Sequence, residues 1–175
     1  MNNEIKGRVK ASLLAGTVAI AVNTVGLAAS SRFGIATAHG GLLKFCETLL
    51  FHLMHLAGLE HTAFEWPSGA FGKTVFHVAV GYLMAFVYGV WLAHILKGSP
   101  LKKGLSYGAS LWALNALVVL PLVGEGIAGT NDIGTIGVAS FALIHTSFFV
   151  ILALVYEQIN RSDQNTRCIR PAKSS

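Results

Sequence analysis

Histidine and carboxylate side chains form the first candidate chemical site in the sequence. His52 and His55 are three residues apart, so a helix would place both imidazoles on one face. With His77, Glu125 and Asp132 they could line an outer vestibule or bind a divalent metal. A zinc site normally has three or four ligands at matching spacing, and the sequence contains no HExxH or CxxC motif. We therefore favour histidines bonded to water and lipid headgroups, and predict no metal.

Asn115 and His145 form a second candidate pair, because each lies near the middle of a long apolar segment. A polar group in hydrocarbon needs a partner, so we predict an Asn115–His145 hydrogen bond that joins two helices. The functional alternative makes His145 a proton relay or a ligand in a water-filled cavity. Haem with two histidine ligands needs a second central histidine, which only a homo-oligomer sharing His145 would supply. We favour the structural interpretation and predict no cofactor.

No catalytic set is recognisable elsewhere in the chain. The sequence has no motif that combines a nucleophile, a base and an acid, so we predict that the protein is not an enzyme. Its two cysteines, Cys46 and Cys168, lack the spacing of metal ligands.

The elements that position these side chains follow from composition. Of the 175 residues, 53% are hydrophobic and only 12% are charged, whereas soluble domains are about 25% charged. The formal charge of +5 comes from short basic clusters beside apolar segments, which is typical of membrane topology and argues against nucleic-acid binding. We predict an all-α membrane protein whose partner is the lipid bilayer.

Four apolar segments are long enough to cross a bilayer and contain no Asp, Glu, Lys or Arg. These predicted spans are residues 11–30, 74–96, 105–124 and 134–156. The first is longer than the apolar region of a signal peptide, so we expect it to be retained. Together they predict a four-span bundle within a single domain, residues 1–158, followed by a basic, disordered cytoplasmic tail at 159–175.

Residues 42–61, LLKFCETLLFHLMHLAGLEH, are apolar but carry charges, and hydropathy does not decide whether they cross. If they do not, and the N-terminus is cytoplasmic, only Arg32, Lys44 and Lys73 lie outside. Ten cations are then inside, as the positive-inside rule favours: Lys6, Arg8, Lys10, Lys97, Lys102, Lys103, Arg161, Arg167, Arg170 and Lys173. We predict a multi-pass membrane protein with both termini in the cytoplasm.

A polar stripe indicates how the segment at 41–59 lies. Lys44, Thr48, His52 and His55 share one helical face, and the remaining circumference is mostly apolar. This pattern predicts an amphipathic interfacial or partly re-entrant helix on the outer side, packed against the bundle.

Small residues recur every four positions in three of the spans, a pattern that favours close helix packing in membranes. They are Ala11, Ala15 and Ala19; Gly81, Ala85 and Gly89; and Gly104 and Gly108. Pro121 should kink the third span. Aromatic residues near span ends predict an interfacial belt, comprising Trp66, Trp91, Tyr82, Tyr88, Tyr107 and Tyr156.

The second half of the chain resembles a known family. The segments KGLSYGASLWALNALVVLPLVGEGIAG and ASFALIHTSFFVILALVYEQI resemble the YagU-like bacterial inner-membrane proteins. The matching positions are Pro121, Leu122, Gly124 and His145, with His77 similar to a histidine before that family's second span. The resemblance covers roughly residues 70–157. It implies several spans in the inner membrane and no settled activity.

These observations predict a small integral membrane protein with a non-catalytic accessory, assembly or envelope-stress role. One alternative is an oligomeric channel or transporter in which His145 and Asn115 line a polar cavity. Another is a metal- or haem-binding redox membrane protein. A homo-oligomer or a membrane-protein partner would suit any of them.

Overall fold

The computed structural model describes residues 3–37, 40–58 and 69–169, and these residues form helices and connecting loops without a strand. Four helical segments are long and apolar enough to cross a membrane: Glu4–Arg32, Gly69–Ile95, Pro100–Leu122 and Ile127–Ser162. The chain is therefore an all-α, multi-pass membrane protein, as predicted. The first three helical segments begin before the predicted start of their spans, whereas in the fourth the non-helical backbone of Gly134 (φ 61°, ψ 176°) separates the preceding turn from the helix at the predicted start.

The spans are built from α1 (Asn3–Arg32), α3 (Gly69–Val87), α5 (Pro100–Leu114) and α7 (Thr130–Ile169), with α2 (Gly41–Leu56) outside the bundle. One π-helical turn, η1 (Tyr88–Leu92), joins α3 to α4 (Ala93–Ile95), and another, η2 (Asn115–Val119), joins α5 to α6 (Leu120–Leu122). A short 3-10 turn, η3 (Ile127–Gly129), precedes α7. The second π-helical turn lies just before Pro121, which has no N–H for Leu117; the kink expected at Pro121 stays a prediction.

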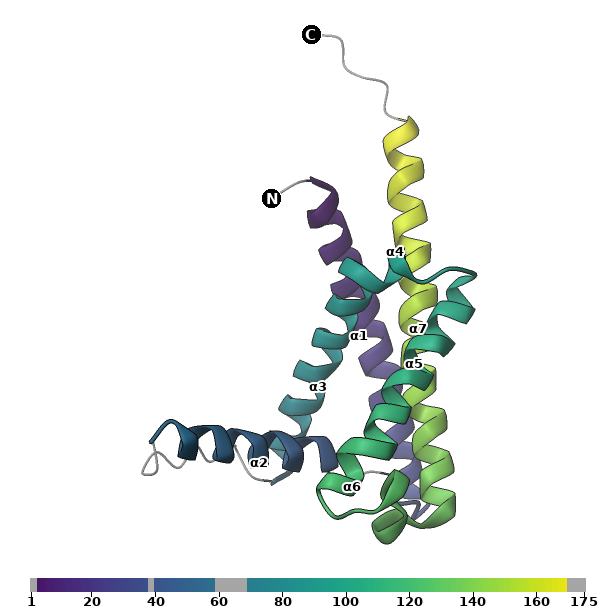
Figure 1. The fold of residues 1–175 in the computed structure, drawn as a ribbon. Helices are drawn as coiled ribbons and strands as arrows, with labels where there is room; N and C mark the ends of the chain where they lie inside the picture. Colours follow the sequence, from purple (N-terminus) through teal and green to yellow (C-terminus); the bar gives the residue numbers. More distant parts are fainter. Residues whose placement is uncertain (1–2, 38–39, 59–68, 170–175) are drawn as a thin grey trace.

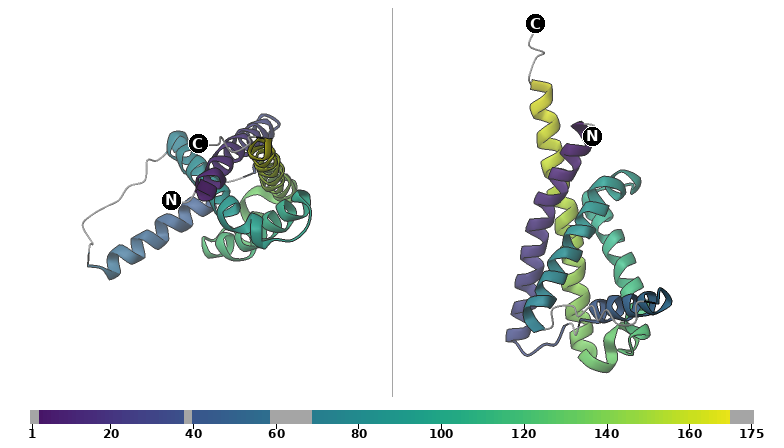
Figure 2. Two further views of the ribbon diagram at one scale, coloured as in Figure 1. Left: turned by 90° about the horizontal axis from the view of Figure 1, so that it is seen from above. Right: turned by 90° about the vertical axis from the view of Figure 1, so that its left-hand side faces the viewer.

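The two ends of the bundle differ. Helix α1 begins and α7 ends at one end, which we call the terminal end (Figure 1). At the opposite, distal end α2 extends sideways from the bundle (Figures 1 and 2). Helix α7 packs against both α1 and α5, and α3 packs against α1.

The tail prediction differs from the structure over residues 159–169, because α7 continues as a helix to Ile169. This stretch contains neither Gly nor Pro and begins with Ile159, Asn160 and Arg161 directly after a long helix, so nothing in it interrupts propagation. Residues 170–175 lie outside the described part of the chain.

The predicted small-residue rows form the helix contacts. Ala11, Ala15 and Ala19 of α1 are buried, and a Cβ atom added to Gly81 of α3 would lie 2.6 Å from Ile20 Cγ1. The contact between α5 and α7 involves backbone atoms rather than a side chain. A Cβ atom on Gly104 would lie 2.7 Å from the backbone oxygen of Phe149, so glycine is required for the helices to meet.

Three tyrosines predicted for the interfacial belt instead lie in the core. Tyr88 and Tyr156 are fully buried and Tyr107 nearly so, with the rings of Tyr88 and Tyr107 stacked at 6.0 Å. The hydroxyl of Tyr156 donates to the backbone oxygen of Gly89 (2.9 Å), and that of Tyr107 to Met84 O (3.3 Å). These bonds allow tyrosine to be buried in hydrocarbon. The belt prediction is therefore wrong for these three residues, and Trp66 lies outside the described residues.

Candidate functional site

The junction between α2 and the distal end of the bundle is the first candidate site. Gly40 precedes α2 in the left-handed region, with φ of 80°, which glycine adopts at little cost. Gly41 is buried, and a Cβ atom there would collide with the side chain of Leu120 and lie 3.1 Å from Glu125 Oε2. Leu43 is also buried. The start of α2 is thus packed against the bundle, whereas the prediction was that the whole helix would pack there.

An ion pair reinforces this junction. Lys44 Nζ donates to Glu125 Oε1 at 2.7 Å, and the Glu125 side chain is only 6% exposed whereas that of Lys44 is 48% exposed. The hydrogen bond to Glu125 raises the pKa of Lys44, against the opposing effect of its desolvation, while the charges of Glu125 and Asp132 raise that pKa further. Lys44 therefore stays charged at neutral pH.

The loop that carries Glu125 is held by its own backbone. Glu125 N donates to Leu120 O (2.9 Å), and Asn131 N donates to Glu125 O (3.2 Å). Asn131 Nδ2 also bonds Gly124 O, and Ala128 has a positive φ of 57°, which is uncommon outside glycine. The loop therefore presents the Glu125 carboxylate in a fixed position.

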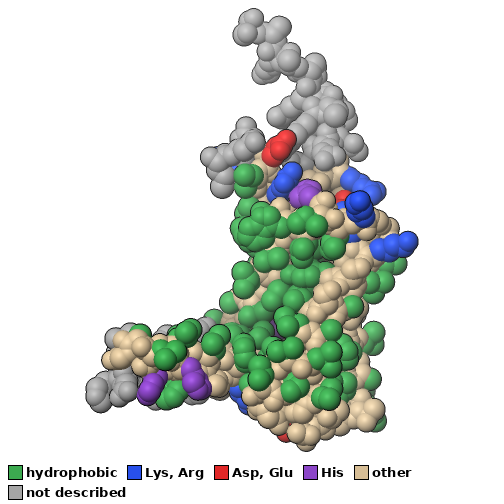
Figure 3. Space-filling model, in the orientation of Figure 1, with side chains coloured by type: hydrophobic (Ala, Val, Ile, Leu, Met, Phe, Trp, Pro, Cys, Tyr) green, Lys and Arg blue, Asp and Glu red, His purple; other side chains and the backbone are tan. Residues whose placement is uncertain are grey.

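Beyond Lys44, α2 leaves the bundle and exposes most of its surface. The exposed apolar side chains are Leu49, Leu50, Phe51, Leu53 and Leu56. His52 Nδ1 lies 2.7 Å from the backbone oxygen of Thr48, and His55 is exposed on the same stripe. Histidine side chains lie along the lower edge of α2, with hydrophobic side chains along the edge nearer the bundle's apolar surface (Figure 3).

The five predicted vestibule residues do not form one ligand set. Glu125 pairs with Lys44, Asp132 is exposed in the first turn of α7, and His77 is half-buried within α3. His52 and His55 are exposed farther along α2. Within the described ranges, no group of three or more His, Cys, Asp or Glu side chains could hold a metal ion.

The predicted Asn115–His145 hydrogen bond is not formed. His145 Nε2 is buried without a partner, and the ring packs beside Phe149 (centroids 5.0 Å apart) and Phe141 (5.7 Å), one turn away on either side. These aromatic neighbours surround the imidazole, while Asn115 begins the π-helical turn η2. The prediction is wrong because depth alone does not determine which way a side chain points.

Asn23 makes the polar contact between helices that we had assigned to Asn115. Its Nδ2 donates to the backbone oxygen of Ile144 at 3.1 Å, and the side chain is buried. The sequence contained a signal for this contact, because Asn23 continues the row of Ala11, Ala15 and Ala19 at the same spacing. A polar residue in a buried row can be expected to bond across the helix contact.

Among the residues that the structure describes, three buried side-chain atoms have no hydrogen-bond partner: His77 Nε2, Tyr88 Oη and His145 Nε2. Two of them belong to the span formed by α3 and η1, and the third belongs to α7. Two spans therefore carry buried polar atoms that could form a further hydrogen bond. Leaving such a group unpaired costs about 1–3 kcal/mol. Each of these atoms would accept or donate a bond to water if water reached it.

A second ion pair closes the terminal end. Lys103 Nζ donates to Glu157 Oε1 at 3.0 Å and to the backbone oxygen of Ala93 at 2.6 Å, with the two side chains 13% and 19% exposed. We had placed Lys103 in a loop, but Ser99 caps α5 and Pro100 begins it. The Ser-Pro pair was the available signal for this earlier start.

Comparison with protein-family models, with curated proteins and with solved structures finds no match to this chain. The fold and the two sites define a class: a multi-pass membrane protein with four membrane-length helices and a further helix attached at the distal end. The YagU-like resemblance stays a prediction.

Proposed function

We propose that the chain is a small, non-catalytic accessory or envelope-stress protein of a bacterial inner membrane. Its bundle holds α2 along the surface of that membrane that faces away from the cytoplasm. The observation that carries the proposal is the junction between Lys44 and Glu125, which fixes the start of α2 while its apolar side chains remain exposed. In this role the exposed polar stripe of α2 is the surface offered to a membrane-protein partner.

The distribution of charge supports the orientation. Blue side chains gather at the terminal end in Figure 3, and the described cations there include Lys97, Lys102 and Arg161. Because the positive-inside rule favours cations in the cytoplasm, α2 falls on the outer side.

The chemistry of α2 supports an interfacial position. Leu53 lies on the helical face opposite Thr48 and His55, and Leu49 lies beside Leu53, about 100° from Thr48. Full burial of each large apolar side chain contributes about 1.5–3 kcal/mol. A helix with this division of faces lies in the interface plane, with imidazoles in the headgroup layer.

Spin labels at two positions of α2 test the proposal. In a Cys46→Ser/Cys168→Ser background reconstituted into vesicles, a label at Leu53→Cys should collide mainly with oxygen, which concentrates in lipid. A label at Thr48→Cys, the matched position on the polar stripe, should collide mainly with a water-soluble nickel complex. Equal access of the nickel complex to both labels would show that α2 stands in water and would overturn the proposal.

A second candidate function, an oligomeric channel or transporter, is favoured by one observation, the buried and unpartnered nitrogens of His77 and His145. Polar atoms of this kind mark proton or ion pathways in many membrane proteins. A pH-dependent flux in proteoliposomes that His145→Ala abolishes would support this function. The same flux from wild type and variant would reject a role for His145 in it.

A further inference from the structure

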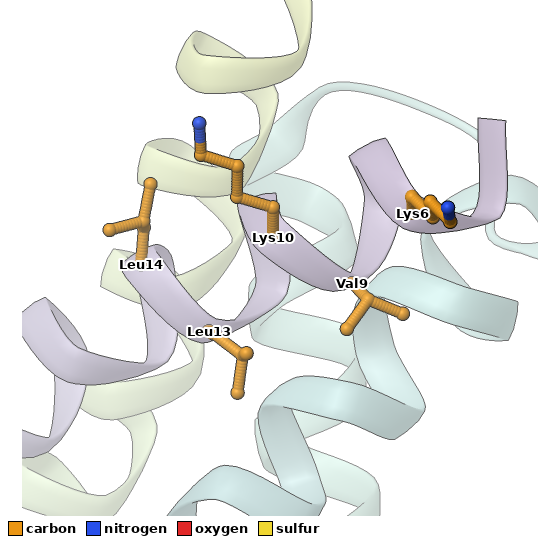
Figure 4. Close-up of a pocket in the computed structure, with 5 residues that line it drawn as sticks. All are labelled: Lys6, Val9, Lys10, Leu13 and Leu14. Carbon is orange, nitrogen blue, oxygen red and sulfur yellow. The ribbon is translucent and has the colours of Figure 1, made fainter. Parts of the chain in front are cut away.

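We propose that a shallow hollow on the outer face of α1 binds one anionic phospholipid of the leaflet at the terminal end. The hollow has a volume of about 360 Å³ and is lined by Lys6, Val9, Lys10, Leu13 and Leu14. The apolar hollow takes an acyl chain along the two leucines, and the ammonium groups of the two lysines, which extend beyond its lining, meet the headgroup phosphate (Figure 4). The inference depends on the membrane position of α1 and is independent of α2.

The spacing of the lining residues suits such a ligand. Lys6 and Lys10 are one helical turn apart, so both ammonium groups reach the same face. Figure 4 shows Val9 and Leu13 on one side of the hollow and Lys10 and Leu14 on the other. From Lys6 to Leu14 the helix rises about 12 Å, which is enough to pass from the headgroup layer into hydrocarbon.

The hollow faces away from the bundle. Ala11 and Ala15, on the other face of α1, are buried against neighbouring helices, whereas Leu13 and Leu14 are 46% and 48% exposed. In a membrane these leucines contact lipid. The lysine stems can extend along the apolar surface while their charges remain at the headgroup level.

Charge selects the class of lipid. The hollow is lined by two cations and no acid, and within the described residues neither lysine has an ion-pair partner. Each lysine near an anionic bilayer surface contributes about 1 kcal/mol of attraction. A nucleic acid or an acidic peptide would satisfy the lysines but leave the apolar half of the hollow without a counterpart. A phospholipid satisfies both halves.

The test compares two charge-matched double variants of the full chain in vesicles of phosphatidylcholine with phosphatidylglycerol. Electron paramagnetic resonance of spin-labelled lipids measures the preference of the protein for the anionic lipid. Lys6→Gln/Lys10→Gln should lower that preference about fivefold for each lysine lost. Lys97→Gln/Lys102→Gln removes the same charge at the same end but outside the hollow, so it loses only the general attraction to the surface and should lower the preference at least about fivefold less than Lys6→Gln/Lys10→Gln.

Two controls make the outcomes unambiguous. A topology reporter at Ser175 confirms that each variant inserts in the same orientation as wild type. Inorganic phosphate, added in millimolar excess, should not displace the labelled lipid, because the leucines do not bind a free ion. Displacement by phosphate, or an equal loss of preference in both double variants, would overturn the proposal and leave only general attraction to the charged surface.

Discussion

The two ends of the bundle are both closed by a lysine–glutamate pair, but the pairs stand in different surroundings. Lys103 and Glu157 are both largely buried and tie α5 to α7, with the same lysine also bonding Ala93, the first residue of α4. At the distal end, Lys44 is half exposed and holds a helix that otherwise leaves the bundle. The comparison teaches that the terminal pair is part of the core, whereas the distal pair attaches the start of a single helix to the bundle.

Removing the terminal pair should have the largest effect. Glu157→Ala leaves the Lys103 ammonium with little access to water and without its counter-ion, so we expect a loss of about 3 kcal/mol in the free energy of unfolding. Unfolding in detergent with increasing denaturant measures it. Restoring stability by the second change Lys103→Met would confirm that the unpaired charge causes the loss.

The glycine contact beside that pair should be next in size. Alanine is a better helix former than glycine by about 1 kcal/mol, yet Gly104→Ala should destabilise the protein by about 1–3 kcal/mol, because its Cβ meets backbone atoms of α7. Thermal unfolding in detergent checks the sign. Ser110→Ala, on the exposed face of the same helix, is the control and should change stability by less than about 0.5 kcal/mol.

Two tyrosines of the terminal core provide a matched pair. Tyr156→Phe removes a bond to Gly89 O and should cost about 1 kcal/mol, while Tyr88→Phe removes a hydroxyl without a partner and should be neutral or stabilising. Both variants are compared by chemical denaturation. A marked loss in Tyr88→Phe would indicate that its hydroxyl bonds to internal water, as the transporter alternative requires.

Glu125→Gln, which loosens the distal junction, should have the smallest effect on global stability. We expect a loss of under about 1 kcal/mol, because Lys44 remains hydrated when the carboxylate charge of Glu125 is removed. The contribution of the pair should also vary with pH. Since the pKa of Lys44 is raised in the folded state, the pair's stabilisation is complete below the ordinary lysine value of about 10.4 and is lost as pH rises through the higher folded value.

The measurement for this last case is the mobility of a spin label at Thr48→Cys. In Glu125→Gln it should increase at neutral pH, and in the otherwise native chain it should increase only in strongly alkaline buffer. An unchanged label mobility in Glu125→Gln would mean that Gly41 and Leu43 alone hold α2.

Composition and length were sufficient for the four spans, because a bilayer admits few alternatives for long apolar segments. The buried tyrosines and the terminal ion pair could not be predicted in the same way. Charged residues were excluded from the spans, so α5 seemed to begin at Leu105 and α7 to end at Tyr156. Helix α5 in fact begins at Pro100, so Tyr107 lies two turns inside it. Lys103 also lies within this helix, because its charge is paired with Glu157.

For the candidate site, the stripe on α2 and its contact with the bundle were predictable from helical periodicity. The partner of each polar side chain was not. Asn115 and Asn23 have similar positions in their spans, and only packing decides that Asn23 faces α7. The junction with Glu125 depends on a loop conformation with several positive φ values, which hydropathy does not encode.

The two π-helical turns have a consequence for evolution of the helix contacts. On a regular α-helix, residues spaced by four drift about 40° around the axis at each step, so a long row soon turns away from its neighbour. A wider turn rotates the row back by a comparable amount. The buried row of Gly81, Ala85, Gly89 and Ala93 passes through one such turn, and Ala116 and Leu120 continue the glycine row of α5 through the other. Deleting one residue within either turn would therefore swing the far end of that span out of phase with its partner.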